Sequence, residues 1–477
     1  MLFTSLEFYL SLTAVFLLWL VMPMAKRPLV LLAASYALCA SWQPWFVLVL
    51  LFSTLASWGA GLWLAGSADA ITRKQVLILA VFVNLLPLLF FKYFNFFNAS
   101  LTTVFSTVGW TFSPPQLSLL LPIGLSFYTF QAISYCVDVY KNRIEAESDL
   151  WTLALYLAFF PRLISGPIER GAAMLPQLKR PARLDSALFV TGFQLFVWGV
   201  FKKIVIADRM SMYVAMVFGS PETMYGKTAI IGAWIYSLQI YCDFSAYMDM
   251  AIGCGRIFGI ELSRNFYFPY MARSIADFWR QWHITLTSWF RDYVYIPLGG
   301  NRAKPQYRAV NVMIVFLLSG LWHGAAWTFV FWGGLHGLLY LAGWFTAPVR
   351  KRVRELLGVR GTFAALWQMF ITFQLVTLAW VFFRARTVED AFVLIRNMFI
   401  NLDLPVRMLS SQMSTYLAFG FALVFVAVEF IAYWADKKGR NPVLIIPPLA
   451  RYPAYAIGLL IMSLFGISSH EFIYFQF

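Results

Sequence analysis

The chain has 477 residues, of which 61% are hydrophobic and 12% are charged, and its formal net charge is +15. A composition this apolar excludes a water-soluble globular protein, and four cysteines in a chain of this length do not suggest a disulfide framework. Most of the basic residues fall in short loops between apolar runs, where an excess of Lys and Arg marks the cytoplasmic side of a membrane. The charge therefore indicates topology, and we expect no nucleic-acid partner.

Apolar runs that reach the roughly 20 residues needed to cross a bilayer as a helix follow one another along the chain. The first run, Phe8 to Val21, lacks a basic leader and a small-residue cleavage site, so we interpret it as a retained span. With the basic loops kept in the cytoplasm, the sequence predicts an all-α polytopic protein of the inner membrane, one integral domain over residues 1–477, with both termini on the periplasmic side. The twelve predicted crossings are 5–22, 28–45, 46–65, 76–97, 117–140, 187–210, 228–254, 309–330, 331–347, 362–383, 412–434 and 452–469.

Some segments fit this scheme poorly. Lys202 and Lys203 would lie inside a crossing, and the break between Val330 and Phe331 carries no strong signal. The apolar segment 150–167 and the amphipathic segment 274–297 have basic loops nearby and do not fit as crossings. Irregular backbone at membrane depth is tolerated only where it lines a cavity or is buried in protein, so we expect these segments to be re-entrant or interfacial pieces beside a cytoplasmic cavity.

The chain lacks the common local signatures of catalysis and metal binding. It has no GxSxG nucleophile elbow, no Walker phosphate loop and no HEXXH motif. The cysteines form no CxxC pair and are interpreted as small apolar packing residues, so no metal site is predicted. The cysteines are Cys39, Cys136, Cys242 and Cys254.

His323 is the most informative polar residue because it lies within the apolar stretch from Val310 to Trp332. An imidazole at membrane depth is costly unless it has partners or faces a water-filled cavity. Histidine is also the side chain best suited to move a proton at neutral pH. A packing histidine bonded to a backbone carbonyl would have the same sequence context, so the residue alone leaves both interpretations open.

Tryptophan, arginine and aspartate gather between Asp277 and Tyr293, around a second histidine, His283. If this segment is one helix, its large apolar side chains share a face with a basic edge. Such a helix is typical of a membrane interface, where Trp and Arg collect at headgroup level, and it equally suits a cavity wall whose arginines meet an anionic ligand. The residues of the expected common face are Trp279, Trp282, Leu286 and Trp289.

Two aspartates in the apolar run Tyr241 to Asp249 are a further candidate. Asp243 and Asp249 are six residues apart and do not share a helix face closely. They suit a proton pathway or a structural pairing with arginines such as Arg256, and we favour the structural pairing.

Taken together, several stretches resemble the membrane-bound O-acyltransferase (MBOAT) family, and more narrowly its bacterial alginate O-acetylation branch. The resemblance covers nearly the whole chain and is best from residues 121 to 337. The stretches that carry it are LLPIGLSFYTFQAISYCVDVY, FPRLISGPIER, YCDFSAYMDMAIGCG, IADFWRQWHITLTSWFRDYVYIPLGGNR, LLSGLWHGAAWTFVFWGGLHG and the terminal FIYFQF.

The resemblance implies a fold of about 11–12 transmembrane helices, with re-entrant pieces, around a central tunnel. It implies acyl transfer from a cytoplasmic donor to a hydroxyl acceptor, with His323 as the catalytic histidine and His283 as the second active-site histidine. In this branch the acyl group is acetyl, acetyl-CoA is the expected donor and no cofactor stays bound. The end recipient is an exported polysaccharide such as alginate or cellulose.

For thioester-to-alcohol transfer, we assign His323 as the base on the acceptor hydroxyl, and His283 as the residue that polarises the thioester carbonyl or orients the donor. We expect a basic and aromatic donor site in which arginines meet the phosphates of coenzyme A. The residues proposed for this site or the tunnel are Trp279, Arg280, Trp282, Arg291, Asp292, Arg302 and Trp322.

The C-terminal tail 470–477, which begins with His470, is rich in aromatic residues. Such a tail is common at a membrane interface. In the related D-alanylation system of teichoic acids, a separate small peptide ends in a similar motif, and the resemblance implies that Tyr474 accepts the acetyl group here. The expected partners are a periplasmic esterase-like protein of the SGNH type, a polysaccharide synthase and export complex, and membrane lipids.

Three alternatives stay open at this point. The same chemistry acylates peptidoglycan or teichoic acid. A transporter would also have many spans and buried charges, but it predicts two related halves, and the sequence shows no such internal symmetry. A scaffold that recruits the polysaccharide export machinery without chemistry is the third.

Overall fold

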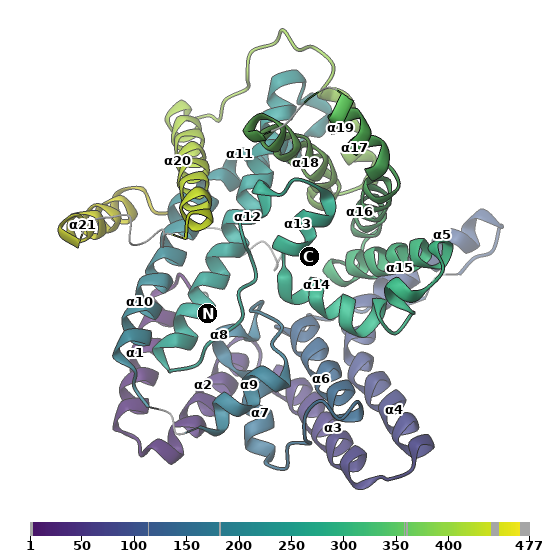
Figure 1. Ribbon diagram of the computed structural model, residues 1–477, viewed down its shortest axis with the longest axis vertical. Coiled ribbons are helices and arrows are strands. Elements are labelled where there is room, and N and C mark those ends of the chain that lie inside the picture. Colours follow the sequence, from purple (N-terminus) through teal and green to yellow (C-terminus); the bar gives the residue numbers. More distant parts are fainter. Residues whose placement is uncertain are drawn as a thin grey trace. The chain divides into compact units, whose positions relative to one another are not determined.

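The computed structural model describes residues 3–112, 114–180, 183–356, 358, 361–439 and 448–467. Every regular element in these ranges is helical (Figure 1). Five helical stretches are long and apolar enough to cross a membrane, and Leu6–Val21 and Tyr452–Phe465 are shorter apolar helices. The predicted all-α polytopic membrane fold is therefore confirmed, whereas the number of crossings stays a prediction. The five stretches are Phe46–Gly66, Ala70–Thr107, Ser186–Gly219, Gly361–Arg384 and Gln412–Lys437.

Backbone contacts divide the chain into two compact units. Unit 1 comprises Met1–Phe196 and Met248–Ser263, and unit 2 comprises Val197–Tyr247 and Arg264–Phe477. The expected single domain over 1–477 stays a prediction. Tyr474 and the tail 470–477 lie outside the described residues.

Unit 1 is built from helices whose bounds follow the apolar runs of the sequence. Within it, α6 packs against α3 and α4, and α7 packs against α2 and α3. The predicted span 117–140 is wrong at its start, because α6 begins only at Leu125, after Pro122 and a left-handed Gly124 with φ 71°. The helices are α1 Leu6–Val21, α2 Arg27–Trp42, α3 Phe46–Gly66, α4 Ala70–Leu88, α5 Phe94–Thr107, α6 Leu125–Tyr140, α7 Leu150–Ala158, α8 Phe160–Leu163, α9 Gly171–Lys179 and α10 Ser186–Phe201, which continues into unit 2.

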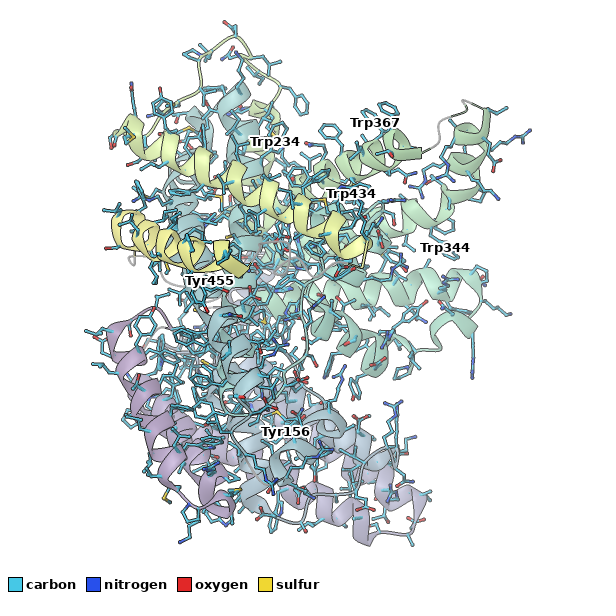
Figure 2. The ribbon with its side chains drawn as sticks, turned by 60° about the vertical axis from the view of Figure 1, so that its left-hand side comes forward. Tyr156, Trp234, Trp344, Trp367, Trp434 and Tyr455 are labelled. Atoms are coloured by element: carbon cyan, nitrogen blue, oxygen red, sulfur yellow. The ribbon has the colours of Figure 1, made fainter. Side chains whose placement is uncertain are left out.

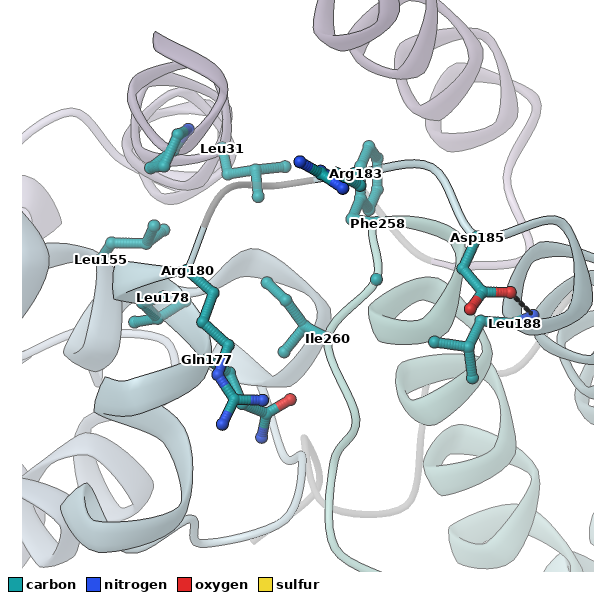
Figure 3. Close-up of a pocket in the computed structure, with 12 residues that line it drawn as sticks. Leu31, Leu155, Gln177, Leu178, Arg180, Arg183, Asp185, Leu188, Phe258 and Ile260 are labelled. Atoms are coloured by element: carbon teal, nitrogen blue, oxygen red, sulfur yellow. Dashed lines mark hydrogen bonds between the residues drawn. The ribbon is translucent and has the colours of Figure 1, made fainter. Parts of the chain in front are cut away.

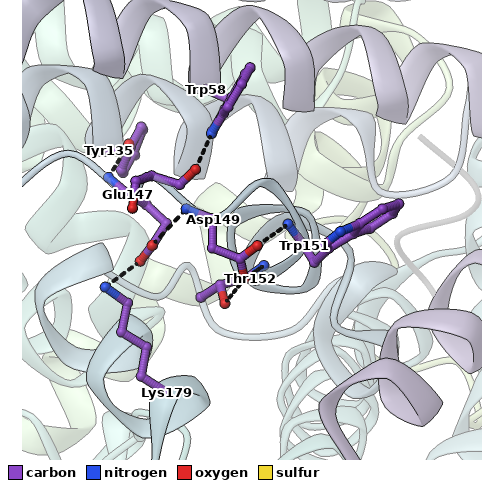
Figure 4. Close-up of polar contacts among 8 residues, drawn as sticks. Trp58, Tyr135, Glu147, Asp149, Trp151, Thr152 and Lys179 are labelled. Atoms are coloured by element: carbon purple, nitrogen blue, oxygen red, sulfur yellow. Dashed lines mark hydrogen bonds and ion pairs between the residues drawn. The ribbon is translucent and has the colours of Figure 1, made fainter. Parts of the chain in front are cut away.

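The segment 150–167 does not cross the membrane as one helix, as expected, because α7 and α8 are short and the chain breaks at Phe159. The loop before it is held by polar contacts (Figure 4). The Trp58 indole donates to the Ser148 carbonyl (3.1 Å), and the Glu147 amide donates to the Tyr135 hydroxyl (2.9 Å). Lys179 Nζ lies 2.7 Å from the buried Glu147 carboxylate. These contacts join the loop to α3, α6 and α9.

Unit 2 contains the remaining helices, together with the first part of α12. Helix α16 packs against α15 and α18, and α13 packs against α16. The α-helices are α11 Asp208–Gly219, α12 Gly226–Ile257, α13 Ile275–Gln281, α14 Ile284–Phe290, α15 Pro305–His323, α16 Trp327–Phe345, α17 Ala347–Leu356, α18 Gly361–Arg384, α19 Val388–Asn397, α20 Gln412–Lys437 and α21 Pro448–Phe465. Unit 2 also has the π-helical segments η3 Lys202–Ala207 and η6 Arg291–Tyr295 and the short 3-10 turns η4 Pro221–Thr223, η5 Pro269–Met271 and η7 Gly300–Arg302. In unit 1 the short elements are the 3-10 turn η1 Met24–Lys26 and the π-helical segment η2 Leu89–Tyr93.

The predicted break at Val330–Phe331 is wrong: α15 ends at His323 and α16 begins at Trp327. The two helices approach closely where Gly320 faces Gly333. A Cβ at Gly320 would lie 2.2 Å from the Phe329 carbonyl oxygen, and one at Gly333 would lie 2.3 Å from that of Phe316. Small residues allow such close helix approach in membranes, so this hairpin is set by packing that the apolar run does not reveal.

Lys202 and Lys203, which fitted the topology poorly, are buried and paired in unit 2. Lys203 Nζ lies 2.8 Å from a carboxylate oxygen of both Asp208 and Asp243, and Lys202 donates to the Ser245 hydroxyl (2.8 Å). Buried charges are tolerated when they are paired in this way. Asp243 therefore has the structural pairing that we favoured, although its partner is a lysine and not Arg256.

Many large apolar side chains face outward, as lipid-facing helices require. Trp367 on α18 is 55% exposed and Leu423 on α20 is 72% exposed. Figure 2 shows Trp367 and, on α21, Tyr455 among these side chains.

Candidate functional site

The cluster from Asp277 to Tyr293 is not one helix, so the predicted common face is wrong. Helix α13 ends at Gln281 and α14 begins at Ile284. Between them, His283 has φ 44°, in the left-handed region that few residues other than glycine adopt.

Asn265 is the reason for this break. Its side-chain oxygen accepts hydrogen bonds from the Thr285 amide and the Thr285 hydroxyl, both at 3.0 Å. Its backbone carbonyl accepts from the Ile284 amide at 2.9 Å. Two of these bonds satisfy the Ile284 and Thr285 amides, which lie in the first turn of α14 and have no partner inside the helix. Asn265 was missed from the sequence, where nothing separates it from any other loop asparagine.

The same asparagine oxygen lies 3.1 Å from Nδ1 of His283. An amide oxygen can only accept, so Nδ1 of His283 carries the hydrogen. In a neutral imidazole the other nitrogen, Nε2, is then an acceptor. The His283 side chain is fully buried. Asn265 therefore selects one tautomer of His283.

His323 is the last residue of α15 and is 4% exposed. Its ring lies edge-to-face on those of Trp332 and Phe383, with centroids 5.1 Å and 5.3 Å away. The His283 ring is 6.3 Å from it. The structure thus brings together, within unit 2, the two histidines that are forty residues apart in the sequence, at the ends of interrupted helices.

Trp282 and Trp322, both predicted for the site, are buried, and Trp322 lies against both histidines. The Trp322 ring lies 5.9 Å from that of His283 and 4.9 Å from that of His323. Trp282 stacks on Phe278 at 5.5 Å. Charge interactions are stronger in buried, apolar surroundings of this kind.

His336 on α16 is also fully buried, with its ring 4.9 Å from Trp279 and 5.0 Å from Trp332. Neither of its ring nitrogens has a hydrogen-bond partner among the described residues. It packs as one more ring of the aromatic cluster. No group of three possible metal ligands comes together in the part of the chain that the structure describes.

Unit 2 also contains a cavity of about 410 Å³, and neither His283 nor His323 lines it. Three arginines, Arg280, Arg291 and Arg308, line it together with Trp279 and Ser319. Along α15 the lining residue nearest to His323 is Ser319, four residues before it.

The arginines of this cavity differ in part from the predicted set. Arg302 is exposed and does not line it, whereas Arg308, which the sequence analysis missed, does. The Arg308 guanidinium lies 4.3 Å from the centre of the Trp344 ring (Trp344 is labelled in Figure 2). Asp292 does not line the cavity but accepts a hydrogen bond from Arg291 Nε at 2.8 Å. That hydrogen bond raises the pKa of Arg291 and keeps its guanidinium charged.

Comparison with known proteins identifies the family. Residues 145–383, which contain both histidines and the cavity, match the model of the membrane-bound O-acyltransferase family. The chain belongs to the MBOAT family. It is a multi-pass membrane protein and an O-acyltransferase, as the resemblance implied.

Three relatives cover most of the chain. A probable alginate O-acetylase AlgI of Pseudomonas aeruginosa is 39% identical over 78% of this chain and 70% of the relative. That of Azotobacter vinelandii is 37% identical over 92% of this chain and 85% of the relative. A peptidoglycan O-acetyltransferase of Helicobacter pylori is 35% identical over 78% of this chain and 75% of the relative.

We predict that His283 is protonated on Nδ1 and unprotonated on Nε2 at neutral pH. Nitrogen-15 solid-state NMR of histidine-labelled protein would show it, because the chain has only four histidines and His283→Ala identifies the signal. Asn265→Leu should abolish the preference. Asn311→Leu, which removes another buried asparagine that instead donates to the Leu298 carbonyl, should not change it. A signal from Nε2–H of His283 in the unmodified protein would contradict the tautomer.

Proposed function

We propose that this enzyme takes an acetyl group from acetyl-CoA in the cytoplasm and passes it across the inner membrane for O-acetylation of an exported cell-envelope polysaccharide. The observation that carries the proposal is the pair His283 and His323, with ring centroids 6.3 Å apart, in the same unit as an arginine-lined cavity. The alginate O-acetylases and the peptidoglycan O-acetyltransferase among the relatives support acetyl as the group and an envelope polymer as the recipient.

His323 acts as the general base in this proposal. It takes the proton from the acceptor hydroxyl as the oxygen attacks the thioester carbonyl carbon. When the carbon–sulfur bond breaks, the proton returns from His323 to the leaving thiolate, so the step is balanced. A base placed in this way contributes roughly 10²–10⁴-fold to the rate.

His283 has the role of orienting the donor. Polarising the thioester carbonyl requires an N–H donor, and the Nδ1 hydrogen of His283 is directed at Asn265. An unprotonated Nε2 suits a donor hydrogen instead, such as the amide N–H next to the thioester in the pantetheine arm of coenzyme A. Of the two roles expected from the sequence, the tautomer favours this one.

The cavity is the proposed donor site. Its volume of about 410 Å³ falls within the range of small-molecule sites. Guanidinium groups bind phosphate oxygens well, and coenzyme A carries its phosphates at the end remote from the thioester. Arg280, Arg291 and Arg308 would hold those phosphates while the pantetheine arm runs along α15 past Ser319 toward His323.

The acceptor side is proposed from the family resemblance and the topology. With both termini in the periplasm, Tyr474 would receive the acetyl group first. A periplasmic SGNH-type esterase-like partner would then move it to the polymer, beside a polysaccharide synthase and export complex. Peptidoglycan is the alternative recipient, since one relative acts on it by name.

His323→Ala should lower acetyl transfer by about 10²–10⁴-fold, the contribution of a placed base, without changing the amount of protein in the membrane. The matched control is His336→Phe. It removes a buried histidine of the same aromatic cluster whose nitrogens have no partner among the described residues, so activity should be retained. Transfer of labelled acetyl from acetyl-CoA in isolated membranes measures both. Full activity of His323→Ala would refute the assignment and favour a scaffold or transporter.

Arg291→Gln and Arg308→Gln should each raise the KM for acetyl-CoA about two- to fivefold, as expected for one exposed charge pair, with little change in kcat. Arg302→Gln removes an equal charge that lies outside the cavity, so it should leave KM unchanged. Steady-state kinetics in membranes would separate these outcomes. Equal effects of all three substitutions would show that only the overall charge matters.

Tyr474→Phe should abolish polymer acetylation while leaving acetyl-CoA binding intact, because the phenol oxygen is the proposed intermediate carrier. Mass spectrometry of the C-terminal peptide from cells that make the polymer should detect acetyl-tyrosine in the unmodified chain. The matched tyrosine control is Tyr452→Phe, on α21, which should leave polymer acetylation unchanged. Full polymer acetylation by Tyr474→Phe would show that the acetyl group bypasses this residue.

A further inference from the structure

Unit 1 contains a second cavity, remote in sequence from both histidines. It has a volume of about 250 Å³ and lies among the start of α2, the end of α9, the start of α10 and the segment after α12 (Figure 3). Leu31, Leu155 and Phe258 contribute apolar surface, whereas Arg180 and Arg183 contribute positive charge. Nothing in the proposed acyl transfer uses this cavity.

Its position marks a membrane boundary. The membrane-crossing stretch Ser186–Gly219 starts here with α10, and α12 ends here at Ile257. Ends of spanning helices lie at the headgroup layer. The basic residues of this loop place it on the cytoplasmic face by the excess of Lys and Arg, where the leaflet is rich in anionic lipid.

The two arginines are available to a ligand. Both are exposed, and neither side chain forms an ion pair or hydrogen bond with another described residue. Asp185 also lines the cavity, and its carboxylate accepts the Ala187 and Leu188 amides (2.8 Å and 3.0 Å) at the start of α10, so two arginines and one acid leave the lining net positive.

One wall of the cavity is built by paired hydrogen bonds. Gln177 donates its side-chain amide to the Glu261 carbonyl (3.1 Å) and accepts the Glu261 amide (2.9 Å). This joins the end of α9 to the chain beyond α12 and holds Arg180 beside the apolar surface.

The volume and the lining of this cavity indicate the class of ligand that fits it. The volume of about 250 Å³ is below the range for a whole cofactor-sized molecule, but a lipid headgroup needs only to place its phosphate and glycerol there while its acyl chains stay in the bilayer. We propose that this cavity binds the phosphodiester headgroup of an anionic phospholipid, with the phosphate at the Arg183 guanidinium and the glycerol end against Leu31 and Phe258, which lie on the same side of the cavity in Figure 3. The proposal does not depend on the acetyl donor or the polymer.

Native mass spectrometry of the full detergent-purified chain tests the site with added phosphatidylglycerol and phosphatidylethanolamine. The chain should retain phosphatidylglycerol at least about tenfold more strongly than the zwitterionic lipid, since each arginine near an anionic headgroup contributes measurably. Arg180→Gln/Arg183→Gln should remove that difference, with an unchanged thermal unfolding midpoint. The control Arg386→Gln/Lys438→Gln removes two exposed charges outside the cavity. The preference for phosphatidylglycerol should remain in this protein.

Two results would overturn the proposal. One is equal retention of phosphatidylglycerol by the Arg180→Gln/Arg183→Gln protein and the unmodified chain. The other is complete displacement of the lipid by millimolar inorganic phosphate, which would assign the cavity to a soluble anion.

Discussion

The site depends on one asparagine oxygen. A helix that ends among buried residues needs other partners for the backbone amides it exposes. The side-chain oxygen of Asn265 accepts the Thr285 amide and hydroxyl, and its carbonyl accepts the Ile284 amide. The chain can therefore turn at His283 between α13 and α14. The same oxygen accepts from Nδ1 of that histidine, so one residue sets both the backbone break and the tautomer.

A second interruption completes the arrangement. Helix α15 ends at His323, where Gly324 is followed by α16. A Cβ on Gly324 would lie 2.1 Å from the Phe329 ring, so only glycine allows the chain to leave the helix here. His283 and His323 therefore both lie at helix ends, where side chains can converge, and the surrounding tryptophans keep the dielectric low around them. Preorganised polar groups in such surroundings stabilise developing charge more effectively than they would in water.

Charged side chains elsewhere in the chain differ in whether they have partners within the protein. Lys203 is as deeply placed as the histidines, but two carboxylates lie 2.8 Å from its nitrogen, and such pairing makes it structural. Arg180 and Arg183 are the opposite case, since they are exposed at a helix boundary without protein partners in the described chain. Whether a charge here is structural or available for binding follows from its partners and not from its depth alone.

Much of the fold could be predicted because a membrane helix satisfies its own backbone. The predicted spans 46–65 and 362–383 agree with Phe46–Gly66 and Gly361–Arg384 almost to the residue, since the length of an apolar run is a local property. His323 and His283 could also be predicted as candidate site residues, from the cost of burying an imidazole and from the family motifs.

What the sequence alone determined, then, is the helical membrane class, the approximate bounds of several long helices and the family, while the two histidines stay predicted site residues. Tertiary structure decided where helices break, which nitrogen of His283 holds its hydrogen, and that Arg308 and not Arg302 lines the cavity. It also decided that Lys203 has two acidic partners. The physical reason is that each of these depends on residues distant in sequence, as Asn265 is from Thr285 or Asp243 from Lys203, and a local apolar pattern holds no information about such contacts.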